Sequence, residues 1–401
     1  MKNIFLLVIL LFLFLVGLPL MGVLVAGENV IQYCEFPPLT FYVAHAPFSW
    51  YLFSSLVIIA ILVFALLFFQ LHHKQSSVSL KTKTKTNPTS FPWWGNLGLL
   101  LILVSWVVAW NRFSLFQILQ PYTFLPLWLG CILFINSLSY FRSGSCLLTG
   151  RPVYFFILFP VSGCFWWFFE YLNRFVQNWY YLGIDDFSAI EYVFHASLSF
   201  STVLPAVLST EELLASFSRL TEPLKTSFVI CCWRNRFINI GVLSASAIGL
   251  IGIGIWPDYL FPLLWLSPLL IMITLQKMMG RATVFDSLGQ GDWRSVWLPA
   301  LAALFCGFFW ELWNVKSYAH WVYSIPFVQK IHIFEMPILG YLGYLPFGLE
   351  CKAVALLVEE VLQKGCESKK LGSSHLAGCV IDAVRNKSQK RTVADGKRFS
   401  L

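Results

Sequence analysis

Residues 4–26 read IFLLVILLFLFLVGLPLMGVLVA, a run of 23 residues without a charged side chain. A helix of about 20 apolar residues is long enough to cross a lipid bilayer. Similar runs recur along the 401-residue chain, which is 58% hydrophobic and only 12% charged. A soluble fold cannot bury so much apolar surface, and disordered chains are far more polar. The sequence therefore predicts an all-α integral membrane protein.

Ten runs with few or no charges have about the length that crosses a bilayer. They cover residues 4–26, 49–71, 92–110, 122–141, 152–169, 192–210, 237–256, 259–276, 295–313 and 336–358. Cytoplasmic connections carry an excess of Lys and Arg. With the N-terminus inside, 23 of these residues fall in cytoplasmic segments and four in external ones. We therefore expect a multipass protein of a bacterial inner membrane, with both termini in the cytoplasm.

The chain also contains an internal repeat. The pattern Phe168…Glu170…Asn173 recurs as Phe309…Glu311…Asn314, and a Trp-x-Tyr sequence follows each copy. Three further similarities occur in the same order, between residues 96–100 and 239–243, 122–130 and 259–267, and 199–205 and 340–346. Two copies of an even number of spans have the same orientation in the membrane. The sequence therefore predicts an N-terminal two-helix hairpin followed by two parallel four-helix repeats.

The expected organisation has six parts. A helical hairpin (1–71) and a basic cytoplasmic linker (72–91) precede the first membrane repeat (92–210). An amphipathic cytoplasmic connection (211–236) follows, and a capping box at residues 209–212 is expected to start its helix. The second membrane repeat (237–360) and a basic, disordered cytoplasmic tail (361–401) complete the chain. The tail is expected to contact anionic lipid headgroups rather than nucleic acid.

The polar residues that the repeat preserves lie at the external ends of the spans. Glu170 with Asn173, and Glu311 with Asn314, are three residues apart and share a helix face. Glu191 and Glu335 open the returning spans, so these six residues are the candidate catalytic groups. A carboxylic acid among aromatic rings can give a proton to a double bond. The candidate substrate-binding residues are Trp167, Trp179, Trp310, Trp313 and Trp321.

Two other interpretations of these residues stay open. Aromatic side chains at span ends commonly form the interfacial belt, and a Glu beside them then has no chemical role. The repeated residues could also serve only to pair the two halves.

Glu350 differs because it lies inside a span, where a carboxyl is costly and marks a proton or ion path. Nearby Lys352 is expected to extend its amine to the inner interface.

The sequence predicts no metal site and leaves any cofactor unknown. Four histidines lie on or near the external side, at His45, His195, His320 and His332. They lack the close His and Glu spacing that builds most metal sites in helices.

The order of Glu, Trp-x-Tyr and a second Glu resembles that of the small bacterial and archaeal lycopene cyclases. In that family a short membrane unit is duplicated, and acidic residues protonate a polyene. The corresponding positions here are Glu170, Trp179 and Glu191 in the first copy, and Glu311, Trp321 and Glu335 in the second. The leading Asp of the family is Glu here, the family's unit is shorter, and its Pro-x-Glu-Glu motif is replaced by residues 189–192 and 333–336.

Three classes of function follow. The first is a membrane enzyme that uses the Glu and Asn pairs for acid–base chemistry on a lipophilic, isoprenoid-like substrate. The second is a transporter or channel with Glu350 on the permeation or proton path, which parallel repeats also favour. The third is a structural membrane subunit. The sequence does not identify a substrate or a transported species.

Overall fold

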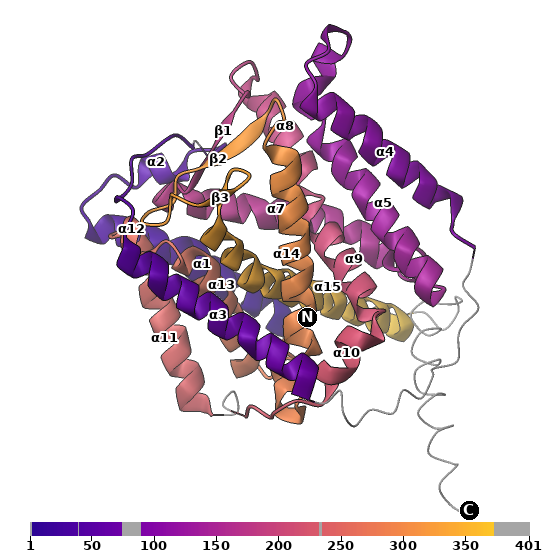
Figure 1. Ribbon diagram of the computed structural model, residues 1–401. Helices are drawn as coiled ribbons and strands as arrows, with labels where there is room; N and C mark the ends of the chain where they lie inside the picture. Colours follow the sequence, from indigo (N-terminus) through magenta and orange to yellow (C-terminus); the bar gives the residue numbers. More distant parts are fainter. Residues whose placement is uncertain (1, 39, 74–89, 232–234, 373–401) are drawn as a thin grey trace, which may run out of the picture.

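The computed structural model describes residues 2–38, 40–73, 90–231 and 235–372 and is mostly helical (Figure 1). Within these residues, eight helical segments are long and apolar enough to cross a membrane. They comprise α1 (Lys2–Val25), α3 (Trp50–His73), α4 (Trp93–Trp110), α5 (Phe124–Ser143), α7 (Pro152–Val176), α8 with α9 (Ala189–Phe200 and Val203–Ala215), α11 (Arg236–Ile253) and α14 (Arg294–Asn314). The prediction of a helical membrane protein is confirmed.

Two of the ten predicted spans differ from this description. Residues 259–276 correspond to α12 (Pro257–Leu260) and α13 (Leu263–Met278), and α13 is shorter than the eight segments above. The last predicted span does not begin at Met336, because residues 336–343 form β4 (Met336–Pro337) and the 3₁₀ helix η4 (Ile338–Gly343). Helix α15 (Tyr344–Gly372) follows. This helix continues beyond the apolar run, through a segment that is rich in charged residues after position 358.

The remaining elements are short. They are α2 (Ile31–Cys34), η1 (Ser114–Tyr122), α6 (Leu147–Gly150), β1 (Trp179–Leu182), α10 (Ser218–Lys225), η3 (Asp286–Gln290), β2 (His320–Tyr323) and β3 (His332–Ile333). The predicted linker and tail lie largely outside the described residues, at 74–89 and 373–401.

The predicted start of a cytoplasmic helix at residues 209–212 is wrong. Helix α9 runs through these residues to Ala215, because Leu213 and Leu214 continue its apolar face onto the core. A separate short helix, α10, follows. The capping box of this region of the chain occurs instead at Ser188, whose hydroxyl accepts a hydrogen bond from the Glu191 amide at the start of α8.

Two pairs of helices flank a central group. Helix α4 packs along α5, and α11 packs along α13, whereas α9, α14 and α15 pack against one another between these pairs (Figure 1). Small residues permit the close approach of α4 and α5, since a Cβ atom on Gly98 would lie 2.8 Å from the Gly130 carbonyl oxygen. Helices α1 and α3 bury little of their surface, as expected for helices that face lipid.

Strands β1 and β2 join the two halves of the chain. They pair antiparallel, with Trp179 opposite Tyr323 and Tyr181 opposite Trp321. Figure 1 shows this two-stranded ribbon at one end of the molecule, beyond the end of α14. We refer to this end as the ribbon end.

Ion pairs also connect the halves away from the ribbon. The Lys352 amine lies 2.8 Å from a Glu211 carboxylate oxygen, and the Arg151 guanidinium lies 2.6 Å from that of Glu359. The Lys352 amine, which the sequence predicts at the inner membrane interface, thus binds a carboxylate of α9.

A third ion pair lies between α13 and η3. The Lys277 amine lies 2.6 Å from Asp286 Oδ1, and the Thr283 amide and hydroxyl also donate to this carboxylate. Burial alone would raise the pKa of Asp286, but these hydrogen bonds outweigh burial and hold the pKa below its usual value.

Candidate functional site

Glu170 lies near the end of α7 and is completely buried. Its Oε1 atom accepts hydrogen bonds from the Trp166 indole at 2.9 Å, the Trp179 indole at 3.1 Å and the Tyr181 hydroxyl at 2.6 Å. Trp166 lies one helical turn before the carboxyl, and β1 supplies the other two donors. The carboxyl therefore fixes three aromatic side chains from two elements.

Glu311 occupies the corresponding place in α14 and is also completely buried. Its Oε1 atom accepts from the Tyr323 hydroxyl at 2.7 Å and the Tyr344 hydroxyl at 2.8 Å. The Trp321 indole donates to the Tyr323 hydroxyl at 2.8 Å. Each carboxyl thus binds a Tyr of the neighbouring strand, and the remaining donors differ.

The second oxygen of each carboxyl has no hydrogen-bond partner among the described residues. A buried carboxylate normally needs several donors or a cation to offset its lost hydration. A protonated carboxyl group would need fewer donors. Each buried carboxyl therefore keeps one oxygen that no donor of the described residues engages.

The two asparagines organise the strands rather than the carboxyls. Asn173 donates to the Trp179 carbonyl at 2.7 Å and accepts from the Asn178 amide at 2.8 Å. Asn314 donates to the Trp321 carbonyl at 2.7 Å and accepts from the Trp321 amide at 2.9 Å. Each amide thus acts on the carboxyl only through the strand that it places, because that strand carries donors to the carboxyl.

The hydroxyls of the two strand tyrosines keep their protons near neutral pH. Burial raises the pKa of Tyr181 well above its usual value, and the neighbouring Glu170 raises it further. Burial, followed by Glu311 and Tyr344, raises the pKa of Tyr323 in the same way. Both phenols therefore act as hydrogen-bond donors.

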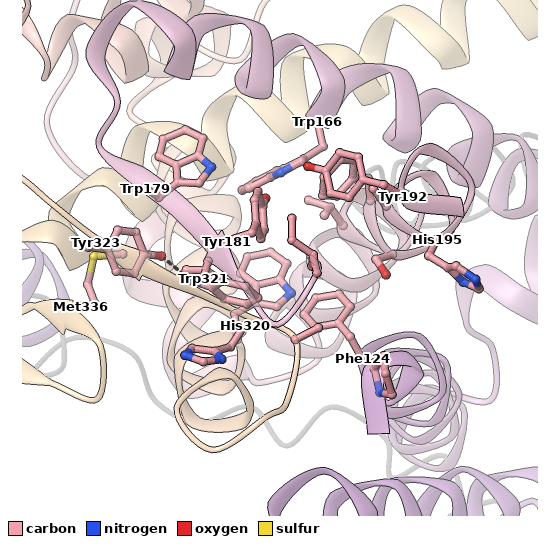
Figure 2. A pocket seen from close by; sticks show the side chains of 18 of the residues that line it. Phe124, Trp166, Trp179, Tyr181, Tyr192, His195, His320, Trp321, Tyr323 and Met336 are labelled. Carbon is pink, nitrogen blue, oxygen red and sulfur yellow. Dashed lines mark hydrogen bonds between the residues drawn. The ribbon is translucent and has the colours of Figure 1, made fainter. Parts of the chain in front are cut away.

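A cavity of about 150 Å³ lies between the halves at the ribbon end. Figure 2 shows side chains of both halves around it, with Trp166, Tyr181 and Tyr192 facing one another. Its wall is predominantly aromatic and includes Phe124, Trp166, Trp179, Tyr181, Tyr192, Trp265, Trp310, Trp321, Tyr323 and Tyr344. All five side chains that donate to the two carboxyls thus lie in the wall of one cavity.

The carboxyls and amides themselves do not line this cavity. Glu170, Asn173, Glu311 and Asn314 lie behind its wall and reach it through the tryptophans and tyrosines that they bind. Aromatic rings line the cavity instead, and five of these side chains, Trp166, Trp179, Tyr181, Tyr323 and Tyr344, donate from their polar atoms to a carboxyl.

Three of the five tryptophans predicted to bind substrate line the cavity, namely Trp179, Trp310 and Trp321. The other two are engaged elsewhere. The Trp167 indole donates to the Ser197 hydroxyl at 2.9 Å, and Trp313 packs edge-on against Trp128.

The outer pair of glutamates does not join the two buried carboxyls. Glu191 is exposed and caps α8 through Ser188. Glu335 is partly buried in the turn between β3 and β4, so it does not open a helix as the sequence predicted. Neither glutamate lines the cavity.

Glu350 is buried in α15, and neither of its oxygens has a hydrogen-bond partner among the described residues. It is not among the residues that line the cavity. The structure therefore places this carboxyl apart from the two that hold the cavity wall.

The histidines are dispersed. His195 and His320 lie at the edge of the cavity, and Figure 2 shows the His195 ring turned away from the neighbouring labelled rings. His45 instead binds Asp258, at 2.6 Å, and the Gln177 carbonyl. Among the described residues, no three His, Cys, Asp or Glu side chains come together as a potential metal site.

Sequence reasoning missed several residues of the cavity wall. Tyr181 and Tyr323 were visible in the Trp-x-Tyr motifs, although only the tryptophans were assigned a role. Tyr344 gave no such signal, because the corresponding residue of the first half is Val203. Comparisons of the chain with family models, curated proteins and solved structures gave no match.

Proposed function

We propose that this protein is a membrane-embedded enzyme that binds part of a lipophilic, isoprenoid-like molecule and transfers a proton to or from it. The observation that carries the proposal is one aromatic cavity whose wall hydroxyls bond to two buried carboxyls, one from each half. Apolar pockets with few convergent polar groups are the usual form of small-molecule sites. Here the polar groups are also ones that exchange protons.

The size of the cavity supports a ligand that enters only in part. An engineered apolar cavity of about 150 Å³ holds a molecule such as benzene. A long isoprenoid would place one ring-sized or branched end here and leave the rest in lipid. The absence of charged side chains among the lining residues favours such an apolar end.

The resemblance to lycopene cyclases gives the proposed reaction its form. A wall hydroxyl gives its proton to one carbon of a double bond and regains a proton from the carboxyl behind it, which leaves a carbocation and a carboxylate. Aromatic faces stabilise the cation. Loss of a proton from a neighbouring carbon returns that proton to the pair, so the reaction needs no co-reactant.

The proposed architecture is a duplicated unit with ten spans, both termini inside and a bacterial inner membrane as its location. Three pairs of elements support the duplication, since α7 and α14, β1 and β2, and α9 and α15 begin 141 or 142 residues apart. The equivalent bonds of Asn173 and Asn314 support it further. Reporter fusions test the topology; strong periplasmic-reporter activity after residue 280 would contradict it.

The tail beyond residue 372 is proposed to bind anionic headgroups, and the membrane lipids are otherwise the expected partners.

Transport is the second candidate, and one observation favours it. Glu350 is buried without a partner, as a carboxyl on a proton path would be. Transport by rocking of the two halves would have to break or bend the β1–β2 pairing and the Lys352–Glu211 pair. Proton flux into proteoliposomes that Glu350→Gln abolishes would favour this candidate over the enzyme.

Binding of geraniol, a simple isoprenoid alcohol, tests the proposed site. Tritiated geraniol is equilibrated with the protein in nanodiscs and with empty nanodiscs. We expect saturable binding that Ala196→Phe abolishes, because Ala196 lines the cavity. Val193→Phe adds the same side chain to α8 at a position outside the cavity lining and should preserve binding.

A second measurement separates chemistry from binding. Incubation in D₂O should place deuterium on a carbon of a turned-over isoprenoid, as detected by mass spectrometry.

In the binding experiment, equal geraniol retention by the Ala196→Phe and Val193→Phe variants, or by empty nanodiscs, would refute the proposed site.

A further inference from the structure

Four tyrosines line the cavity, and three of them are already engaged. The hydroxyls of Tyr181, Tyr323 and Tyr344 donate to the buried carboxyls. The fourth tyrosine, Tyr192, makes no hydrogen bond through its hydroxyl to any of the described residues. A tyrosine hydroxyl in an apolar wall usually finds a partner. Tyr192 therefore offers the cavity a donor that the protein itself leaves unused.

The Tyr192 hydroxyl is accessible as well as unpaired. The second oxygens of Glu170 and Glu311 are also unpaired, but they are sealed off, whereas the Tyr192 oxygen is not. Figure 2 shows this hydroxyl turned towards Trp166, into the space between the rings. The centroids of the Tyr192 and Tyr181 rings lie 6.3 Å apart. The ring with the free hydroxyl thus lies beside the ring whose hydroxyl donates to Glu170.

The sequence of α8 explains why this side chain faces the cavity. Tyr192, Ala196 and Ser199 line the cavity and follow one another at spacings of four and three residues, so they share one face of the helix. Trp167 packs edge-on against the Tyr192 ring, with 6.2 Å between the centroids. The Ser199 hydroxyl and the Trp265 indole, which also line the cavity, have no hydrogen-bond partner in the described parts of the chain either.

These unused groups are neutral, and this limits the ligand. A carboxylate or phosphate would bring a charge into an apolar wall, and no Lys or Arg is among the described residues that line it. A pure hydrocarbon would displace water from the hydroxyl and leave it without any partner, which costs free energy. An alcohol or carbonyl oxygen avoids both costs, because it accepts a hydrogen bond and carries no charge.

We propose that the Tyr192 hydroxyl donates a hydrogen bond to an oxygen of the ligand, so that the isoprenoid end that enters the cavity is an alcohol or a carbonyl rather than a hydrocarbon. This inference rests on the proposed function and narrows its substrate class. The contact places the oxygen-bearing end beside Tyr181 and the hydroxyl that bonds to Glu170. The remainder of that end packs against the aromatic rings of the wall.

A pair of ligands that differ by one oxygen tests the inference. Tritiated geraniol and tritiated deoxygeraniol, the hydrocarbon in which hydrogen replaces the hydroxyl group, are each equilibrated with the protein in nanodiscs. Both affinities are referred to the uptake by empty nanodiscs. We expect the unchanged protein to bind geraniol at least about fivefold more tightly, as one neutral hydrogen bond provides. Tyr192→Phe should reduce this preference to within about twofold by weakening the binding of geraniol alone.

Two controls separate the hydroxyl contact from packing. Tyr180→Phe removes a hydroxyl from the other face of β1, where Tyr180 packs against Tyr42 outside the cavity lining, and should preserve the preference for geraniol. Without ligand, Tyr192→Phe should unfold at the same SDS fraction as the unchanged protein, because its hydroxyl has no partner to lose. Tyr181→Phe should unfold at a lower fraction, because it removes a donor from Glu170.

Three results would overturn the inference: equal affinities of the unchanged protein for the two ligands, equal weakening of both in Tyr192→Phe, or a preference that Tyr180→Phe also abolishes. Failure of Tyr192→Phe to fold would overturn it too, since it would reveal a partner for the hydroxyl within the protein. If both ligands bind saturably and equally well, the proposed site stands and only the oxygen contact is refuted. If neither binds saturably, the proposed function fails and this inference fails with it.

Discussion

Replacing Asn173 by alanine removes the side chain that holds the start of β1 on the end of α7. The change leaves the buried Trp179 carbonyl and Asn178 amide without this partner. Each unpaired buried group costs about 1–3 kcal/mol, so we expect a loss of about 2–6 kcal/mol in the free energy of unfolding. Asn314→Ala should cost a similar amount, because it releases the amide and the carbonyl of Trp321.

The two changes should not add. Because β1 pairs with β2, loosening either strand weakens the anchor of the other, and residues of one network couple by at least about 0.5 kcal/mol. Unfolding by SDS in mixed micelles, followed by tryptophan fluorescence, measures both single variants and the double variant.

Asn111→Ala is the matched control. Its side chain makes one exposed hydrogen bond, to the Val107 carbonyl, and its loss should change stability by less than about 0.5 kcal/mol. If Asn173→Ala costs no more than this control, or if the effects of the two buried asparagines are strictly additive, the proposed coupling through the ribbon is incorrect.

Three further predictions concern other parts of the fold. Lys352→Met should destabilise the protein by about 1–3 kcal/mol in the same assay, since it leaves the Glu211 carboxylate without its cationic partner. Adding Glu211→Gln should recover part of this loss in stability. The depressed pKa of Asp286 stabilises the folded state above the unfolded pKa of about 3.9, and this contribution is lost as the pH falls further; Asp286→Asn should flatten the stability profile below about pH 4. Gly348→Ala should cost about 1–3 kcal/mol, because its Cβ would meet the backbone of α14. Gly241→Ala, in open space on α11, should be neutral or stabilising by up to about 1 kcal/mol, and equal losses for the two would contradict the packing argument.

Much of the fold could be predicted because apolar runs of membrane-crossing length have few alternatives. The helices near residues 4–25 and 50–71 follow directly from such runs. The start of the last helix could not be predicted this way. Residues 336–343 are apolar, yet they form a short strand and a 3₁₀ turn that complete the cavity wall. Hydropathy does not distinguish these conformations.

The candidate site was predictable only in outline. Repetition of Glu and Asn marked the two carboxyls, and the structure places each beside its Trp-x-Tyr strand. Repetition cannot reveal a residue that differs between the halves, and Tyr344 is such a residue. Nor could spacing show that the asparagines bind backbone groups, because a buried amide can satisfy either a side chain or a strand.

The register of β1 and β2 has a consequence for how such a chain could arise. The Trp of each strand lies opposite the Tyr of the other, so each strand presents to its partner the same surface that it receives. This reciprocity is the rule of an isologous interface, in which two identical subunits meet about a dyad. A half-length ancestor could therefore have closed the same ribbon with a second copy of itself, as a homodimer. Fusion of the two genes would have freed each strand, and each carboxyl behind it, to change separately.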